Sequence, residues 1–245
     1  MTSENSDGSI QLRGFANEIK THEELMTVVF PNLEVKFKDH PWLCERAILC
    51  PKNEDVTITN DTLLTRLPGP LRTYKSIDTV YEKDEVVNYP TEFLNSLEIS
   101  GIPQHKLNLK EGAPIMLLRN LDPPNLCNGT RMSIKKLHNN IIEATVLTGP
   151  AAGTDVLIPR IPIIPSDIPF QFKRLQFPIR LSFAITINKA QGQTLKVVGV
   201  DLRTPCFSHG QLYVACSRVG CRDNLNILCT EGKTTNVVYP EALKD

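Results

Sequence analysis

The sequence has no long hydrophobic run and no cysteine pattern that would mark a metal site. No apolar stretch approaches the roughly 18 residues of a membrane-spanning helix. The polar start has neither the basic nor the apolar segment of a signal peptide. The seven cysteines form no Cys-x-x-Cys pair and have no histidine at zinc-finger spacing, which argues against a disulfide framework and a structural zinc site. We therefore expect no metal, no membrane partner, and a nuclear or cytoplasmic protein.

The chain has ordinary globular composition but an uneven charge distribution. Its 245 residues include 41% hydrophobic and 22% charged residues, and the formal net charge is zero. Residues 1–100 contain 10 Lys and Arg against 17 Asp and Glu, whereas residues 171–245 contain 10 against 5. A polyanion would therefore be attracted to the C-terminal third, although such an excess is also common on plain protein surfaces.

The first part of the chain has the pattern of an α/β protein. The spacing of apolar residues predicts a helix over Phe15 to Met26. Ala47 to Cys50 is a short apolar run that ends at Pro51, as in a buried strand. Asn53 can then cap a helix that continues to Leu67.

The middle of the chain is rich in short β-strand patterns. Asn128-Gly129 predicts a tight hairpin turn, and further turn signals stand at 138–140 and 149–153. Together these patterns predict a small barrel or rolled sheet. The proline-rich stretch Ile161 to Pro169 is interpreted as a linker that leaves it. The expected strands are Pro114 to Leu121, Arg131 to Leu137, Ile141 to Leu147 and Val156 to Ile161.

The last third returns to alternating strand and helix patterns, which predict a parallel sheet covered by helices. Asn188 can cap a helix after the first strand, and Ser208 with Gln211 forms a capping-box pattern for a second helix. The expected strands are Leu181 to Ile187, Val197 to Leu202 and Leu225 to Cys229.

The segment Thr186-Ile187-Asn188-Lys189-Ala190-Gln191-Gly192-Gln193-Thr194 places polar residues where a buried strand meets a helix. Ligands bind at this carboxyl edge in open α/β sheets. Free N–H groups at a helix start attract phosphates, Lys189 adds positive charge, and Gly192 permits close backbone approach. The plainer interpretation is that Asn188 only caps the helix and Lys189 is only a solvated side chain.

A second motif is Gln211-Leu212-Tyr213-Val214-Ala215-Cys216-Ser217-Arg218-Val219. Gln211 and Arg218 are seven residues apart and would share one face of a helix whose other face is apolar. A rigidly held arginine there can serve as an arginine finger on a γ-phosphate. A lone arginine on a helix is more commonly a surface residue.

In this order and spacing, the two motifs resemble the fifth and sixth helicase motifs of the petite-integration-frequency (PIF) family. Its members are RecD-related, ATP-dependent 5′-to-3′ DNA helicases, and Helitron transposons carry one branch. Residues 47–56 are similar to the fourth motif, and residues 89–95, 112–122 and 127–131 are similar to an SH3-like insertion. Residues 180–184 and 208–211 are similar to the segments that lead into the fifth and sixth motifs, and residues 236–240 to the ending of the transposon-borne branch.

The resemblance implies a RecA-like α/β domain, of the P-loop NTPase type, interrupted by an SH3-like barrel. Its expected parts are residues 1–90 and 171–245 for the second RecA-like domain and 91–170 for the insertion, called the 2B domain. It also implies roles in DNA repair, recombination or telomere maintenance, and mitochondrial location is possible for the family. The barrel is expected to flank DNA and help to separate its strands.

The resemblance also assigns roles to individual residues. Arg218 would contact the γ-phosphate, with Gln211 beside it. The other positions would contact single-stranded DNA or face the inter-domain cleft; these are Thr186, Asn188, Lys189, Gln191, Gly192, Thr194, Lys52 and Asn53.

The family's phosphate-binding Walker A loop and its acidic magnesium-holding motif are missing from this sequence. Gly232-Lys233-Thr234 would need a glycine at position 227, where the chain has Ile227; we interpret it as a surface turn. Asp201 lacks the acidic neighbour of a Walker B motif. We therefore expect ATP and Mg²⁺ to be bound only together with a first RecA-like domain, supplied in cis or in trans.

Three hypotheses remain open at this point. The chain is the distal half of a helicase motor, or a stand-alone nucleic-acid-binding module such as a transposon remnant, or an inactive scaffold. Retention of Lys189, Gly192, Thr194 and Arg218 favours the first over the third. An arginine finger has no use in a pure binding module, which also favours the first.

Overall fold

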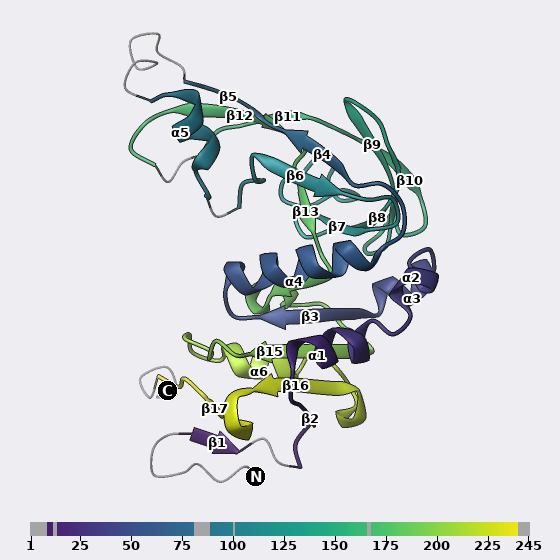
Figure 1. Cartoon of the computed structure of the whole chain (residues 1–245), viewed down its shortest axis with the longest axis vertical. Coiled ribbons are helices and arrows are strands. Elements are labelled where there is room, and N and C mark those ends of the chain that lie inside the picture. The colour runs from purple at the N-terminus through teal and green to yellow at the C-terminus, as the bar shows by residue number, and fades with distance from the viewer. Residues whose placement is uncertain (1–8, 12–13, 81–88, 100, 166–167, 240–245) are drawn as a thin grey trace. The chain divides into compact units, whose positions relative to one another are not determined.

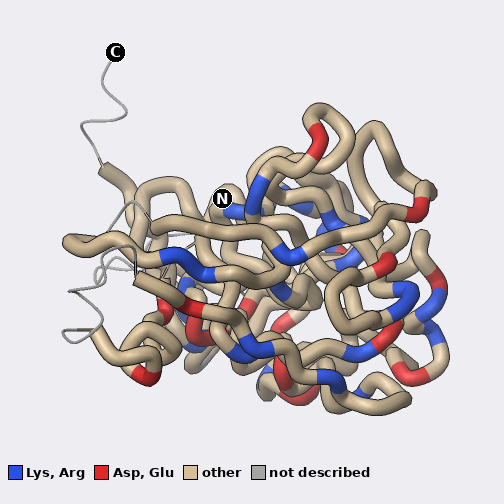
Figure 2. Tube along the Cα trace, turned by 90° about the horizontal axis from the view of Figure 1, so that it is seen from above, with Lys and Arg blue, Asp and Glu red and all other residues tan. Residues whose placement is uncertain are grey.

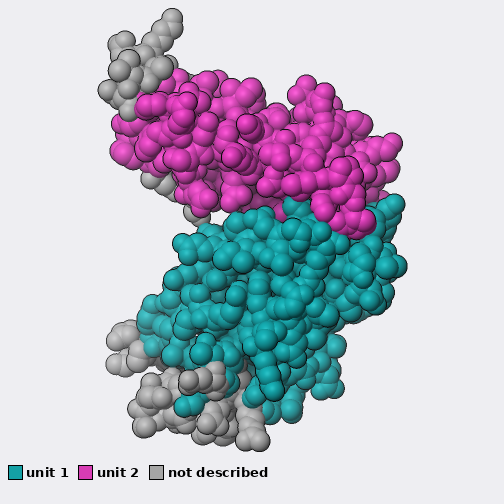
Figure 3. Space-filling view, viewed as in Figure 1, with its two compact units in different colours: residues 1–66, 182–245 teal, residues 67–181 magenta. Residues whose placement is uncertain are grey.

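A computed structural model describes residues 9–11, 14–80, 89–99, 101–165 and 168–239. The chain divides into two compact units (Figure 3). Unit 1 comprises residues 1–66 and 182–245, and unit 2 comprises residues 67–181. Unit 2 is therefore longer at both ends than the insertion expected at 91–170. The reason is that strands before residue 91 and after residue 170 pair with strands of the insertion.

Unit 1 is built on a parallel sheet. Its described strands follow the order β14-β3-β15-β16-β2, and each neighbouring pair is parallel (Figure 1). The expectation of a parallel sheet is thus confirmed. The strands are β2 (Asn17–Ile19), β3 (Arg46–Cys50), β14 (Ala184–Thr186), β15 (Val197–Leu202) and β16 (Leu225–Cys229), and β1 (Ser9–Gln11) pairs separately with β17 (Lys233–Thr235).

Helices pack on this sheet through buried apolar side chains. A Cβ atom on Gly199 of β15 would lie 2.7 Å from Val29 of α1, so only glycine permits this close approach. Phe30 makes edge-to-face contacts with Trp42 and Phe183, which close the core after α1. The elements are α1 (His22–Val29), α2 (Leu33–Lys36), α3 (His40–Cys44), α4 (Asn53–Arg66), α6 (Gln211–Cys216) and the 3₁₀ turns η2 (Ile187–Ala190), η3 (Arg222–Asn224) and η4 (Thr230–Gly232).

Unit 2 is mainly antiparallel β-structure. Its described sheets have the orders β10-β9-β8-β7-β13, β11-β12-β5 and β4-β6. The turn at residues 138–140 joins β8 and β9 as expected, with the His138 N–H donating to the Ile141 carbonyl. Its elements are β4 (Arg72–Lys75), β5 (Ile77–Val80), α5 (Thr91–Ser96), β6 (Lys106–Leu109), β7 (Pro114–Leu117), β8 (Arg131–Leu137), β9 (Ile141–Val146), β10 (Asp155–Pro159), β11 (Ile161–Ile163), β12 (Phe172–Gln176) and β13 (Ile179–Leu181).

Two expectations for connecting segments of unit 2 were wrong. Asn128-Gly129 forms a turn, closed by Thr130 N–H and the Cys127 carbonyl, but it lies inside the longer connection between β7 and β8. The stretch predicted as a linker contains the edge strand β11. Pro162 is tolerated there because an edge strand pairs on one side only, so the missing N–H need not break the ladder. Residues 166–167 of that stretch lie outside the described residues.

Two boundaries in unit 1 also differ from the prediction. The helix expected over Phe15 to Met26 begins only at His22, because the Thr21 hydroxyl caps it by accepting from Glu24 N–H, and residues 17–19 form β2. The strand expected over Leu181 to Ile187 is two strands. β13 pairs antiparallel with β7, and β14 pairs parallel with β3.

The C-terminal segment also departs from the expected surface turn. Lys233 and Thr234 belong to β17, and Thr234 is buried. The end of the segment similar to the transposon-borne branch, Pro240, lies outside the described residues.

Candidate functional site

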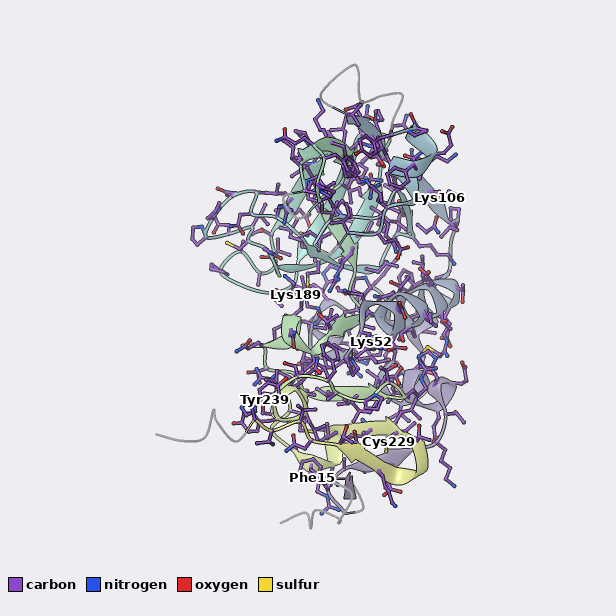
Figure 4. The ribbon with its side chains drawn as sticks, turned by 90° about the vertical axis from the view of Figure 1, so that its left-hand side faces the viewer. Phe15, Lys52, Lys106, Lys189, Cys229 and Tyr239 are labelled. Atoms are coloured by element: carbon purple, nitrogen blue, oxygen red, sulfur yellow. The ribbon has the colours of Figure 1, made fainter. Side chains whose placement is uncertain are left out.

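Two chain segments leave the carboxyl edge of the unit 1 sheet side by side. β14 ends at Thr186, and Thr186 lies opposite Cys50, the last residue of the parallel strand β3. The segments beginning at Ile187 and at Pro51 therefore emerge next to each other. Of the residues expected to contact DNA, Lys52, Asn53, Asn188 and Lys189 are exposed at this edge. Lys52 and Lys189 are labelled in Figure 4.

The edge strand β14 is held by a side chain that mimics a neighbouring strand. The Asn60 amide of α4 donates to the Ala184 carbonyl and accepts from the Ala184 N–H, both at 2.9 Å. Asn60 is buried, so both bonds are shielded from water. Nothing in the local pattern around Asn60 predicts this contact, because the partners are far apart in the chain.

The helix predicted after Asn188 is absent from the structure, which has the four-residue 3₁₀ turn η2 instead. Ile187 and Ala190 are fully buried, while Asn188 and Lys189 point outward. Gly192 then adopts φ of 81°, a left-handed conformation that ends any helix and favours glycine. The phosphate-attracting helix start expected here was therefore wrong. What remains is a short turn that presents Asn188, Lys189, Gln191, Gly192 and Thr194 to solvent.

Arg218 joins the second motif to this turn. Its Nη1 donates to the carbonyls of Gln193 at 3.2 Å and Ala190 at 3.5 Å, and its Nε donates to the Val214 carbonyl at 2.9 Å. Its own carbonyl accepts from the Leu195 N–H at 2.9 Å. The two motifs that we expected to act together are therefore in direct contact.

Arg218 and Gln211 do not share a helical face as predicted. α6 ends at Cys216, so Arg218 lies beyond the helix. Gln211 is 2% exposed, and its Oε1 accepts from the Phe207 N–H at 3.1 Å. The Ser208 capping box was wrong as well, because Gly210 in the left-handed conformation precedes the helix and no side chain caps it. The Nε2 of Gln211 has no hydrogen-bond partner among the residues that the structure describes.

The structural role of a buried acidic residue near the same edge, Asp201, was not predicted from the sequence. Asp201 of β15 is 1% exposed and makes paired hydrogen bonds with the Arg203 guanidinium, at 2.9 and 2.6 Å. His22, at the start of α1, lies 3.8 Å from this carboxylate and contacts the Thr59 hydroxyl at 2.9 Å. Burial and then the Arg203 charge lower the pKa of His22. The hydrogen bond to Asp201 raises the pKa of Arg203.

Comparison with known proteins places this fold and these motifs in a family. Residues 92–137 match the family model "DNA helicase Pif1, 2B domain". The chain is 30% identical over 181 residues to the ATP-dependent DNA helicase PIF1 of Xenopus laevis, covering 74% of this chain and 27% of that protein. It is 27% identical over 242 residues to the ATP-dependent DNA helicase Pif1 of Campylobacter jejuni, covering 91% of this chain and 51% of that protein. The chain belongs to the Pif1 helicase family.

The structural comparison agrees with this assignment at the level of the fold. A Pif1 helicase from Bacteroides, solved in complex with ADP-AlF3 and ssDNA, matches with a TM-score of 0.61 and 20% identity. The match covers 91% of this chain and 53% of that one. The mixed α/β architecture with a parallel sheet is thus shared with Pif1 helicases. The chain spans between about a quarter and a half of the length of these relatives.

Three further observations concern other kinds of site in this Pif1-family chain. All seven cysteines lie in the described residues and are free. Within the described residues, no group of three or more His, Cys, Asp or Glu side chains is arranged to hold a metal ion. No helix in the described parts of the chain is long and apolar enough to cross a membrane.

Proposed function

We propose that this chain is the second RecA-like domain, with its inserted 2B domain, of an ATP-dependent 5′-to-3′ DNA helicase. The observation that carries the proposal is the contact between Arg218 and the Ala190–Gln193 turn. It connects the residue expected to contact a γ-phosphate with the loop expected to contact single-stranded DNA. The family of the chain and the ssDNA-bound state of its structural relative support the same assignment.

In this proposal, ATP and Mg²⁺ are held by a Walker-bearing first RecA-like domain in cis or in trans. Catalysis of phosphoryl transfer depends on positioning the phosphates and neutralising the charge that develops on them. Arg218 would supply one positive charge to that composite site, and Gln211, at the start of α6, would lie beside the site. The chain would not hydrolyse ATP alone.

The DNA contacts in this proposal come from the exposed edge of unit 1. Thr186, Asn188, Lys189, Gln191, Gly192 and Thr194 would contact the backbone of single-stranded DNA, and Lys52 and Asn53 would lie beside them. Their backbone and polar side-chain groups suit phosphate oxygens, which carry no sequence information. We therefore expect binding with little sequence preference.

One observation favours a second candidate function, a stand-alone nucleic-acid-binding module without ATPase activity. Arg218 donates hydrogen bonds to three carbonyls and to the Ser217 hydroxyl, so most of its donor groups are already used within the chain. An arginine that only positions the DNA-binding turn would have this arrangement. The two functions are separated by measuring ATP turnover, with and without Arg218→Ala, in a fusion to a Walker-bearing first RecA-like domain.

The proposed DNA surface is tested by replacing Lys189 with alanine. Loss of one phosphate contact should lower the slope of log affinity against log salt by about 0.7 for a single strand. Labelled oligonucleotide is titrated with the chain at several salt concentrations, and affinity is expected to be on the order of micromolar or weaker.

The matched control is Lys196→Ala, because Lys196 is exposed just before β15, at the opposite edge of the same sheet, where it pairs with Glu45. The control should leave the slope unchanged. Equal slopes for Lys189→Ala and the unaltered chain would place the single-strand surface elsewhere.

A further inference from the structure

The start of α6, the helix that leads to Arg218, is in contact with the C-terminal segment of unit 1. α6 has six residues, and no side chain caps its start. The N–H groups at a helix start need partners from outside the helix. The Gly210 N–H donates to the Val237 carbonyl at 3.3 Å, and the Tyr239 N–H donates to Nδ1 of His209 at 2.9 Å. Residues 237–239 therefore fix the turn from which α6 begins.

A ring contact strengthens this attachment. The centroids of the His209 and Tyr239 rings lie 5.4 Å apart, and the ring planes are inclined by 19° in a stacked arrangement. The segment is also held just before these residues, because β17 ends at Thr235 and pairs with β1. We call residues 237–239, which follow this strand pair, the C-terminal clasp.

The clasp makes its contacts without charged side chains. Residues 204–217 and 234–239 contain no Lys, Arg, Asp or Glu. The trace just before the grey C-terminal end is accordingly tan in Figure 2. Salt screens the attraction between charges, whereas the contacts of the clasp are neutral hydrogen bonds and a ring stack. The attachment of the clasp should therefore be insensitive to salt, unlike the phosphate contacts of the proposed DNA surface.

Three successive hydrogen bonds connect the clasp with the Arg218 guanidinium. Nε of Arg218 donates to the Val214 carbonyl at 2.9 Å. The Val214 N–H donates in turn to the Gly210 carbonyl, also at 2.9 Å. The Gly210 N–H then donates to Val237, the first residue of the clasp. Because α6 is so short, a shift of its start moves the Val214 carbonyl and with it the guanidinium.

The apolar contacts of α6 restrain this position less sharply. Leu212 and Ala215 are buried, and the helix lies in contact with η2. Apolar contact is non-directional, so it tolerates small shifts of the helix along its axis. Hydrogen bonds weaken steeply when their distance or angle changes. The bonds at the start of α6 therefore define its position more closely than its buried side does.

We propose that His209 and the C-terminal clasp are positioning elements of the sixth motif, which determine where the Arg218 guanidinium lies. His209 acts through α6 and touches no phosphate in this arrangement. The inference rests on the proposed function, because that function gives the positioned arginine its role in ATP turnover. The plainer alternative is that residues 237–239 only pack on the surface of unit 1. It predicts no change at Arg218 or at the Ala190–Gln193 turn when the clasp is released.

The first test measures amide hydrogen exchange in the whole chain, at low and at high salt. His209→Ala removes the acceptor and the stacked ring. Exchange across residues 187–195 and 211–218 should become faster by about fivefold, the effect of losing one neutral hydrogen bond. His209→Asn places a side-chain oxygen near the position of Nδ1 and should restore most of the protection. Neither difference should depend on salt.

The matched control is Ser208→Ala, which changes the same turn at a side chain that does not cap α6. It should exchange like the unaltered chain. Unchanged exchange in His209→Ala would overturn the positioning role, and so would failure of His209→Asn to restore protection. An equal rise across β15 would overturn it as well, because the clasp would then support only the fold.

The second test measures ATP turnover in the fusion to a Walker-bearing first RecA-like domain, with saturating single-stranded DNA. His209→Ala should lower the turnover number by about 10-fold with little change in KM for ATP, because a misplaced arginine weakens the transition state more than nucleotide binding. His209→Asn should recover most of the turnover. Full turnover of His209→Ala, in a fusion that depends on Arg218, would overturn the proposal. If Arg218→Ala leaves turnover unchanged, the proposed function fails, and hydrogen exchange still decides whether the clasp positions Arg218.

Discussion

At the scale of single residues, the buried ion pair between Asp78 and Arg174 is expected to dominate the stability of unit 2. The side chains are 0% and 1% exposed. Removing one member of a buried pair leaves the other charge without a partner, which costs about 3–5 kcal/mol. Asp78→Ala should therefore lower the free energy of unfolding by about that amount in urea denaturation.

A surface pair in the same unit provides the comparison. Asp155 pairs with Lys135, and their side chains are 46% and 45% exposed. Exposed pairs contribute little because water screens their charges, so Asp155→Ala should have a small effect. Equal destabilisation by the two alanine variants would mean that burial of the Arg174 pair does not control stability.

His22 is expected to make unit 1 sensitive to mild acid. Burial, followed by the Arg203 charge, lowers the pKa of His22 in the folded chain. Below the unfolded pKa, about 6.5, the unfolded chain then binds more protons than the folded chain. The stability due to neutral His22 is present above that pH and is lost as the pH falls toward the lowered folded pKa.

The measurement is the free energy of unfolding at about pH 7.5 and about pH 5.5, a window set by this linkage. His22→Gln should reduce the loss of stability between these pH values. His138→Gln, an exposed histidine at the β8–β9 turn, serves as the control. If the loss is as large in His22→Gln as in the unaltered chain, another group is responsible for the acid sensitivity.

At the scale of elements, Arg218 is expected to hold the Ala190–Gln193 turn in place. η2 has no side-chain cap and Gly192 is exposed, so the hydrogen bonds from Arg218 are part of what fixes the turn. Arg218→Ala removes the side-chain hydrogen bonds to Ala190 and Gln193, so amide hydrogen exchange across residues 187–195 should become faster. The exposed Arg222→Ala is the control. Unaltered exchange in Arg218→Ala would show that the turn is ordered without it.

The elements also show which features can be predicted from sequence. The strands at 131–137, 197–202 and 225–229 have the expected bounds, because a continuous apolar or alternating run leaves one possible register. The helix after Asn188 was wrong because Gly192 and the burial of Ile187 and Ala190 override a capping pattern that is only local.

Long-range polar contacts could not have been predicted from local patterns. The Asn60 clamp on Ala184 joins residues 124 positions apart, and the Asp78–Arg174 pair spans 96. In each case the side chain finds its partner only after folding has brought the two distant segments together. The motif residues were found because their order and spacing are characteristic of a family. The carbonyl contacts of Arg218, however, required the structure.

At the scale of the whole molecule, the central claim is that unit 1 supplies an arginine and a DNA-binding edge to an ATPase site completed by another domain. The sequence has segments that resemble the fifth and sixth helicase motifs, and it has no segment that matches the Walker A pattern. The arginine should therefore matter for turnover only when a domain that binds the phosphates and Mg²⁺ is present.

The most direct measurement is phosphate release with saturating single-stranded DNA. It compares the chain alone with the chain fused to a Walker-bearing first RecA-like domain of a Pif1 helicase. We predict no turnover by the chain alone. In the fusion, Arg218→Ala should lower turnover by about 10³-fold or more while nucleotide affinity changes little. Robust turnover by the chain alone, abolished by Arg218→Ala, would contradict the account, and so would a fusion whose turnover is unchanged by this substitution.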